Sequence, residues 1–388
     1  MRIPFNKPFI VGKELFYIAQ AVTKQERLSG DGQFTDLCHK WLNSTLGCPA
    51  SLLTHSCTAA LEMAAILCDL KPGDEVIMPS FTFVSTANAF VLRGAKPVFV
   101  DIRSDTLNID ERLIKNAITE KTKAIVVVHY AGAPCEMDLI MRVAQEHNLY
   151  VIEDAAQALL STYNGSSLGT IGDLGTISFH ETKNIISGEG GALIINNPKM
   201  LERAEIIREK GTDRAKFFRG QIDKYTWVDI GSSFLPSELM AAFLYAQMEE
   251  APKIIKRRCE IFQMYERGLK PLIKEAGIRL PVVTNNSTCN GHLFYILCRD
   301  LEQRTAFIDY MKGCGINTVF HYVPLHSSPA GLKYGTVSGE MINTDRVSDQ
   351  LIRLPLYYEM TDNEVQDVLN EIYNFFELNT DGQQGCAP

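Results

Sequence analysis

Two segments of the chain carry charged residues that could act on one ligand. Val151–Gln157 runs from apolar residues into an acidic pair that ends with Asp154. Further along, Lys183 stands between an apolar stretch and the glycine-rich turn Gly188–Gly191. A carboxylate can hold a positive charge, and a lysine amine can act as a nucleophile or carry a proton. Taken singly, a helix-capping aspartate and a solvated loop lysine are the plainer interpretations.

Two other segments suit a phosphate and a planar ring. Residues Thr54–Leu61 form a turn of small side chains before an expected helix, whose first N–H groups can bind an anion. In the segment Pro79–Thr86, Phe83 stands near the end of an expected strand, from which its ring could stack on a ligand. An ordinary Ser/Thr N-cap and a core phenylalanine are the plainer interpretations of each segment alone.

The combination of the four segments is more specific than any one of them. A phosphate cradle, an aromatic platform, a strand-end carboxylate and a lysine follow in that order, with 29 residues from Asp154 to Lys183. Pyridoxal 5′-phosphate (PLP) needs this set of groups, because a carboxylate keeps its pyridine nitrogen protonated and a lysine attaches it and moves protons. The residues therefore predict a PLP enzyme centred on Lys183 and Asp154.

The pattern of apolar runs indicates how these segments are positioned. Between about residues 50 and 200, short Val- and Ile-rich runs alternate with amphipathic segments of helix length. This alternation predicts a mostly parallel sheet covered by helices on both faces. The connections that follow Asp154 are too short for helical crossovers, so some antiparallel pairing is expected there.

The pattern changes after residue 236 to an α+β alternation. We expect a large domain over residues 1–250 and a small α+β domain over residues 251–378. The small domain would begin with one long charged helix, Pro252–Ala276. The last ten residues, 379–388, are polar with Gly and Pro, and a disordered tail is expected there.

Composition limits the classes of protein. With 388 residues, 46% hydrophobic residues and a net charge of −8, the chain suits a two-domain enzyme and lacks the basic surface of a nucleic-acid binder. Its ten cysteines include no CxxC pair, which favours reduced thiols over zinc or disulfide frameworks. No signal peptide or membrane span is evident. We expect a cytoplasmic enzyme with no metal site and no nucleic-acid or membrane partner.

The chain resembles the DegT-type nucleotide-sugar aminotransferases, a family of PLP fold-type I. The resemblance covers Pro4 to about Phe376. It implies a three-layer α/β/α large domain, a smaller C-terminal α+β domain, PLP as cofactor and at least a homodimer. The motifs that carry it are ProSerPheThrPhe (79–83), GluAspAlaAlaGln (153–157), SerPheHisGluThrLys (178–183) and GlyGluGlyGly (188–191).

The resemblance assigns roles around the cofactor ring. It implies that Lys183 forms the Schiff base with PLP and that Asp154 pairs with the pyridine nitrogen. It also implies that Gln157 lies near the ring hydroxyl and that Phe83 stacks on the ring.

The resemblance also assigns the phosphate site. It implies that Thr58, Ala59 and Ser178 bind the phosphate. Relatives usually add an Asn from the partner subunit, in a Gly-x-Asn segment. The corresponding position here is Ser233, which follows Gly231 and Ser232, so this chain departs from the family pattern there.

More narrowly, segments 223–227 (AspLysTyrThrTrp) and 320–326 (PheHisTyrValProLeuHis) resemble the TDP-4-oxo-6-deoxy-D-glucose aminotransferases of the family. This implies transfer from L-glutamate to C4 of that sugar, giving TDP-4-amino-4,6-dideoxy-D-galactose for surface polysaccharides such as lipopolysaccharide or enterobacterial common antigen. His321, Tyr322 and His326 fall where relatives approach the sugar nucleotide, although a domain-interface cluster explains them as well.

Three alternatives stay open at this point. An aminotransferase of other regio- or stereochemistry would act at C3 or form the gluco epimer. A PLP-dependent sugar dehydratase resembles these proteins but carries His in place of the lysine, so Lys183 argues against it. A non-catalytic PLP-binding regulator would need no proton carrier, so the presence of both Lys183 and Asp154 argues against that reading.

Overall fold

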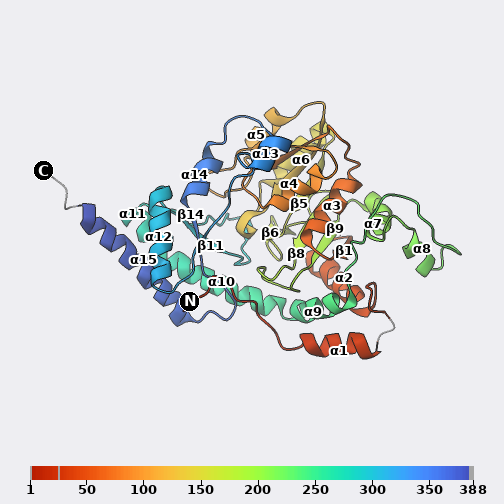
Figure 1. Ribbon diagram of the computed structural model, residues 1–388, viewed down its shortest axis with the longest axis horizontal. Coiled ribbons are helices and arrows are strands. Elements are labelled where there is room, and N and C mark those ends of the chain that lie inside the picture. Colours follow the sequence, from red (N-terminus) through yellow and green to blue (C-terminus); the bar gives the residue numbers. More distant parts are fainter. Residues whose placement is uncertain (1, 25–26, 384–388) are drawn as a thin grey trace.

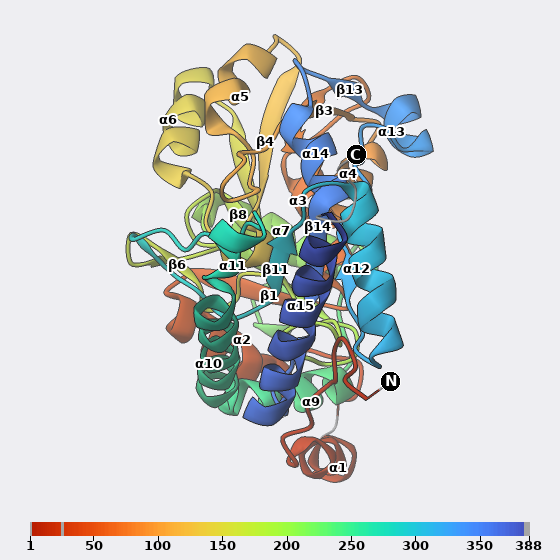
Figure 2. The ribbon, with the colours of Figure 1, turned by 90° about the vertical axis from the view of Figure 1, so that its left-hand side faces the viewer.

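The computed structural model describes residues 2–24 and 27–383 (Figures 1 and 2). Its largest unit is a sheet of eight strands: β1 (Ala50–Thr54), β2 (Glu75–Pro79), β3 (Lys96–Val100), β4 (Thr122–Val128), β5 (Tyr150–Asp154), β8 (Leu174–Ser178), β9 (Gly191–Ile195) and β13 (Thr336–Val337). Their order is β1-β9-β8-β5-β4-β2-β3-β13. All neighbours are parallel except β9, which runs antiparallel to both β8 and β1. The predicted mostly parallel sheet, with antiparallel pairing after Asp154, is confirmed.

Helices cover both faces of this sheet. Successive residues of a strand point to opposite faces, so Ile77 of β2 packs into one apolar cluster and its neighbour Val76 into another. The first cluster includes residues of α2 (Gln33–Leu46), α5 (Glu111–Ala117), α6 (Met137–His147) and α9 (Glu238–Glu249). The second includes residues of α3 (Cys57–Leu67), α4 (Val84–Val91) and α7 (Leu201–Arg208). This is the predicted three-layer α/β/α arrangement.

The C-terminal part contributes a second, antiparallel sheet in the order β11 (Phe294–Leu297), β14 (Leu351–Leu354), β12 (Val319–Phe320). A third apolar cluster joins this sheet to several helices, among them α10 (Ala251–Leu269), α12 (Leu301–Gly313) and α15 (Asp362–Gln383). Figure 2 shows α15 running alongside α12. The division at residue 251 stays a prediction, because Ile3 packs into the third cluster and β13 joins the large sheet.

The remaining elements lie around these two units. They are α1 (Glu14–Lys24), η1 (Tyr130–Gly132), β6 (Thr162–Tyr163), β7 (Ser166–Ser167), η2 (Pro198–Met200), α8 (Arg214–Phe218), α11 (Leu272–Glu275), β10 (Ser287–Thr288), α13 (Pro329–Tyr334) and α14 (Ile342–Gln350). Strands β10, β6 and β7 form a small third sheet in that order. Among the described residues, no helix is both long enough and apolar enough to cross a bilayer.

One expectation about helices needs correction. The expected single helix Pro252–Ala276 is interrupted: α10 ends at Leu269 and α11 follows, with Pro271 between them. Proline has no N–H to donate, so it cannot continue the hydrogen-bond ladder of a helix interior. At the C-terminus, α15 extends to Gln383 and so overlaps the first residues of the expected tail. The disordered tail over residues 379–388 stays a prediction. Residues 384–388 lie outside the described part of the chain.

Candidate functional site

A cavity of about 400 Å³ opens where the parallel strands end. Open α/β sheets bind ligands at this edge, since the carboxyl ends of parallel strands meet there. Asp154 closes β5, and Ser178 closes β8. Eight of the predicted residues line this cavity: Thr58, Phe83, Asp154, Gln157, Ser178, Lys183, His321 and Tyr322.

Asp154 is buried at the base of the cavity, with 6% of its surface exposed. Its Oδ2 accepts a hydrogen bond of 2.6 Å from the Thr86 hydroxyl, and its Oδ1 accepts one of 3.2 Å from the N–H of Ala156. Because Thr86 donates to Asp154, the 2.8 Å contact between Thr82 and Thr86 must be donated by Thr82. The two hydroxyls therefore form a short relay that holds a carboxylate in one orientation.

Lys183 lies in the loop after β8 and lines the same cavity. Burial is the main cause that lowers the pKa of its amine. The thiol of Cys57 and the carboxylate of Asp154 oppose this shift, while the Arg353 guanidinium adds to it. A lowered pKa raises the fraction of neutral amine, which is the form that attacks a carbonyl or accepts a proton.

The start of α3 forms the predicted anion cradle. Ser56 caps the helix, its hydroxyl accepting the N–H of Ala59 at 3.0 Å. The Thr58 hydroxyl lies 2.8 Å from that of Ser85 on α4, and both hydroxyls line the cavity. Gly191 allows β9 to lie close to the start of α3, because a Cβ at this position would lie 2.4 Å from the backbone nitrogen of Cys57. Hydroxyls, free N–H groups and a helix N-terminus together suit a phosphate.

One wall of the cavity is built from hydrogen-bonded polar side chains. The Gln157 side chain accepts the N–H of Ala131 at 2.7 Å and donates to the Tyr322 hydroxyl at 3.0 Å. The Tyr130 hydroxyl lies 3.1 Å from Nδ1 of His321. Burial lowers the pKa of His321 and raises the pKa of Tyr130, so both groups stay neutral. The wall is thus rigid and uncharged.

Three predicted residues do not line the cavity. Ala59 packs its side chain into the apolar cluster behind α3. His326 turns away, with its Nδ1 2.8 Å from the Ser80 hydroxyl and its Nε2 3.3 Å from Asp345. These contacts join His326 to two other segments of the chain, and its expected place near the sugar nucleotide stays a prediction. Ser233 is exposed on the surface, paired with Glu209 through an isolated β-bridge. The predicted role of Ser233 in a partner's site is not tested by one chain.

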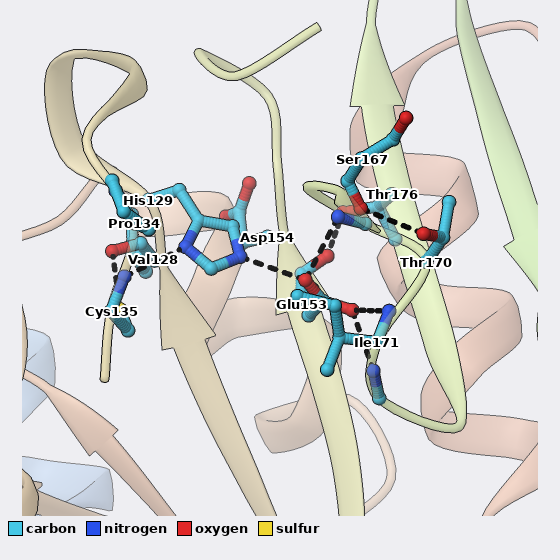
Figure 3. Close-up of polar contacts among 12 residues, drawn as sticks. Val128, His129, Pro134, Cys135, Glu153, Asp154, Ser167, Thr170, Ile171 and Thr176 are labelled. Atoms are coloured by element: carbon cyan, nitrogen blue, oxygen red, sulfur yellow. Dashed lines mark hydrogen bonds and ion pairs between the residues drawn. The ribbon is translucent and has the colours of Figure 1, made fainter. Parts of the chain in front are cut away.

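Behind Asp154, the neighbouring carboxylate Glu153 points to the opposite face of β5 and is fully buried (Figure 3). It accepts the N–H groups of Gly169, Ile171 and Gly172 at 2.8, 2.6 and 2.6 Å. It also lies 2.9 Å from Nε2 of His129. Four donors thus converge on one carboxylate, so Glu153 fixes the loop after β7 to the strand that carries Asp154.

The tautomer of His129 follows from its second contact. The N–H of Cys135 donates to Nδ1 of His129 at 3.2 Å, so Nδ1 carries a lone pair and not a proton (Figure 3). The proton of the neutral ring is therefore on Nε2, which donates it to Glu153. This pair joins the ends of β4 and β5 without placing a charge on the histidine.

Changing Glu153 to Gln is expected to destabilise the fold by about 2–4 kcal/mol, because an amide NH₂ would replace an acceptor that serves buried N–H groups. Thermal and urea unfolding followed by circular dichroism would measure the loss. Glu146→Gln is the matched control, since Glu146 is half-exposed in a surface ion pair with Lys115. A loss below about 1 kcal/mol would contradict the proposed anchoring.

The sequence reasoning missed Thr86 and Arg353. Thr86 ends the segment Pro79–Thr86, in which only Phe83 was given a role. Its hydrogen bond to Asp154 joins residues that are far apart in the sequence. Arg353 lines the cavity from β14. The sequence offers one signal for this residue: Arg353 is the single charged residue in the apolar run Leu351–Leu354, and a charged residue is seldom buried without a reason.

The model of the DegT/DnrJ/EryC1/StrS aminotransferase family matches residues 10–373. The chain belongs to this family. It is 39% identical over 334 residues to an uncharacterised protein of Methanocaldococcus jannaschii, covering 84% of this chain and 86% of that protein. It is 33% identical over 328 residues to the dTDP-4-dehydro-2,3,6-trideoxy-D-glucose 4-aminotransferase of Saccharopolyspora spinosa, covering 83% of each. The solved PMP form of the putative sugar aminotransferase Spr1654 of Streptococcus pneumoniae has a TM-score of 0.88 at 28% identity, covering 97% of this chain and 99% of that one.

As a DegT-family member, the protein is a PLP-dependent sugar aminotransferase that acts on nucleotide sugars. The cavity fits this cofactor. Asp154 offers an unneutralised buried carboxylate to a ring nitrogen, and Lys183 offers an amine to the aldehyde. Phe83 lines the cavity with 58% of its surface exposed, which leaves its ring free to stack. A Cβ at Gly191 would close the phosphate cradle.

Proposed function

We propose that this enzyme moves an amino group from L-glutamate to C4 of TDP-4-oxo-6-deoxy-D-glucose, giving TDP-4-amino-4,6-dideoxy-D-galactose for surface polysaccharides. The observation that carries the proposal is the convergence of Lys183, Asp154 and the wall of His321 and Tyr322 on one cavity. The named 4-aminotransferase relative, whose substrate is a dTDP-4-keto sugar by its name, supports the choice of C4.

Asp154 and Lys183 have separate roles in the proposed reaction. Bound PLP supplies an electron sink that stabilises negative charge on the carbon being deprotonated. The carboxylate of Asp154 maintains positive charge at the ring nitrogen on which that sink depends. The Lys183 Nζ takes a proton from Cα of the amino acid in one half of the reaction and delivers a proton to C4 of the sugar in the other. The face from which Lys183 delivers it decides the C4 configuration.

The uncharged wall suits the sugar half of the reaction. Gln157 holds the Tyr322 hydroxyl at 3.0 Å, so a sugar that reaches this wall meets a polar group in a fixed position. For the phosphate of the cofactor, we assign the hydroxyls of Thr58 and Ser178 as ligands within the chain. We also propose a homodimer in which Ser233, exposed on its own chain, completes the partner's phosphate site. A monomer mass by light scattering would contradict the dimer.

The test is the reaction itself. Purified enzyme with PLP, L-glutamate and TDP-4-oxo-6-deoxy-D-glucose is expected to form an amino sugar with an axial C4 amine, identified by NMR. Omitting L-glutamate provides the control. An equatorial C4 amine would show that the enzyme forms the gluco epimer, and a C3 amine would show that it acts at C3. Either result would contradict the proposed product. Absence of any amine product would contradict the proposed pair of substrates.

A further inference from the structure

His292 is a buried histidine that lines the cavity and takes no part in the proton transfers assigned to Lys183. It lies just before β11, and 6% of its surface is exposed. Its main chain is fixed on both sides, because its N–H donates to the Asn290 side chain at 3.0 Å and its carbonyl accepts Nη2 of Arg258 at 2.7 Å. The ring is therefore held at one place in the cavity wall.

Asn184 fixes the position of the proton on the His292 ring. The Asn184 NH₂ donates to the carbonyl of Asn290 at 2.9 Å, so Oδ1 of the same side chain is left as an acceptor. This Oδ1 lies 3.0 Å from Nδ1 of His292, which must carry the proton of the neutral ring. Nε2 therefore has a lone pair, and no group of the described residues donates to it.

The surroundings of His292 keep its ring neutral. Burial is the main cause that lowers its pKa. Four basic groups lower it further: Lys183, Arg258, Arg353 and His321. Lys183 has the largest effect of the four, ahead of Arg258, although the Arg258 guanidinium is bonded to the His292 carbonyl. The Lys183 amine therefore lies near a ring that keeps its Nε2 lone pair.

We propose that His292 is a positioning residue for Lys183: its Nε2 accepts a hydrogen bond from the lysine amine after a substrate has displaced that amine from the cofactor. The inference rests on the role that the proposed function gives to Lys183. A displaced lysine must stay near the reacting carbon, because it takes a proton in one step and delivers it in the next. Asn184 follows Lys183 in the chain, so its bond to His292 also fixes the ring relative to the lysine main chain.

Asp154 is the competing acceptor for a positively charged lysine. Its carboxylate attracts the Lys183 amine, which raises the pKa of the amine. An ammonium held at Asp154 would compensate the negative charge that the proposed function assigns to the ring nitrogen of the cofactor. His292 avoids this conflict, because a neutral acceptor holds the amine away from the carboxylate. The low pKa of His292 leaves the proton on Nζ, where it is available for delivery.

Substitutions at His292 and Asn184 separate the acceptor from the structure around it. His292→Asn places an amide nitrogen near the position of Nδ1, so it keeps a donor for Asn184 and removes the acceptor at Nε2. His292→Gln can return an oxygen to the position of Nε2. Asn184→Ala keeps the ring and releases its orientation. His147→Asn is the matched control, since His147 is exposed in the last turn of α6 and outside the cavity.

The pKa of Lys183 is measured directly in enzyme loaded with pyridoxamine 5′-phosphate (PMP), in which the lysine is free. Trace labelling with acetic anhydride across a pH series, followed by mass spectrometry of the peptide that contains Lys183, reports the fraction of neutral amine. An acceptor beside an ammonium stabilises the charged form, so its removal lowers the pKa of the amine. We expect a decrease of about one pH unit in His292→Asn, and smaller decreases in His292→Gln and Asn184→Ala.

A single-turnover measurement gives the corresponding rates. PMP-loaded enzyme is mixed with 2-oxoglutarate, and the change in cofactor absorbance is followed at each pH. Lys183 must be neutral to take a proton, so the rate rises with pH as the lysine is deprotonated. In His292→Asn this rise is expected about one pH unit lower, and the limiting rate is expected to fall about 10-fold because Nζ is no longer held. The other groups that act on Lys183 are unchanged in every variant: Cys57, Asp154 and Arg353.

An unchanged or raised pKa of Lys183 in His292→Asn would overturn the inference. An equal loss of rate at every pH, with no displacement of the profile, would assign His292 a general structural role instead. Unchanged melting temperature and PMP absorbance would show that the variant is folded and loaded, and Asn184→Ala decides the question if His292→Asn does not fold. Failure of the role proposed for Lys183 looks different: borohydride would then fix PLP to Lys183→Ala as well. The labelling needs no substrate, so its result does not depend on which amino acid or sugar the enzyme uses.

Discussion

Replacing Lys183 with alanine is expected to lower amino transfer by at least about 10⁴-fold, because the variant loses both the attachment point of the cofactor and the proton carrier. Borohydride reduction followed by mass spectrometry would measure the attachment: PLP becomes fixed to the unaltered enzyme and not to the variant. The rate loss would be measured by single turnover with L-glutamate. Lys199→Ala, at an exposed position of η2, is the matched control.

A second substitution distinguishes a neutral amine from a positive charge at this position. Burial lowers the pKa of Lys183, which favours the unprotonated amine. Arginine keeps its proton under all working conditions and cannot take another. Lys183→Arg is therefore expected to be as inactive as the alanine variant. Retention of more than about a tenth of the activity in either variant, or a fixed cofactor in Lys183→Ala, would mean that another residue carries this role.

The convergence of the predicted residues on one cavity depends on one property of parallel sheets. Asp154 and Ser178 end neighbouring strands, so their convergence follows from strand order alone. Phe83 and Lys183 follow strands by a few residues and reach the same edge. Short segments next to apolar runs could therefore be placed without knowing how the rest of the chain packs.

The contacts that the sequence did not predict join segments distant in the chain. Arg353 reaches the cavity from the small sheet, whose position relative to the large sheet depends on packing between the two units. His326 belongs to the same segment as Tyr322, yet the turn between them directs it toward Ser80 and Asp345. From the sequence alone, Tyr322 and His326 were equally good candidates for the cavity. The path of the backbone decides that only Tyr322 lines it. Ser233 needs a second subunit, which one chain does not supply.

In the fold as well, some features follow from the sequence pattern and others do not. The alternation of apolar runs and helices was sufficient for the three-layer core, because both faces of β4 are buried and its sequence is apolar throughout 124–128. The ends of helices depend on weaker local effects. Pro271 was a visible signal for the break between α10 and α11.

Replacing Asp154 with Asn is expected to slow both halves of the reaction by about 10³-fold while leaving Lys183 able to attach the cofactor. Asparagine has nearly the same shape but no charge, so it cannot maintain a proton on the pyridine nitrogen. Single-turnover rates with L-glutamate and with the amino sugar would measure the two losses, and borohydride fixation would measure attachment. Asp138→Asn is the matched control, since Asp138 is exposed and accepts one bond of 3.1 Å from Asn164.

Thr86 allows the charge of Asp154 to be separated from its orientation. Thr86→Val keeps the carboxylate but removes the 2.6 Å bond that orients it, and Thr86→Ser keeps both. A hydrogen bond to a charged group contributes about 1.5–3 kcal/mol, so Thr86→Val is expected to lose roughly 10- to 100-fold and Thr86→Ser much less. If orientation were the main contribution, Thr86→Val would be as slow as Asp154→Asn. A smaller loss in Thr86→Val than in Asp154→Asn means that the negative charge itself is what the reaction requires, because the carboxylate remains in place without its relay.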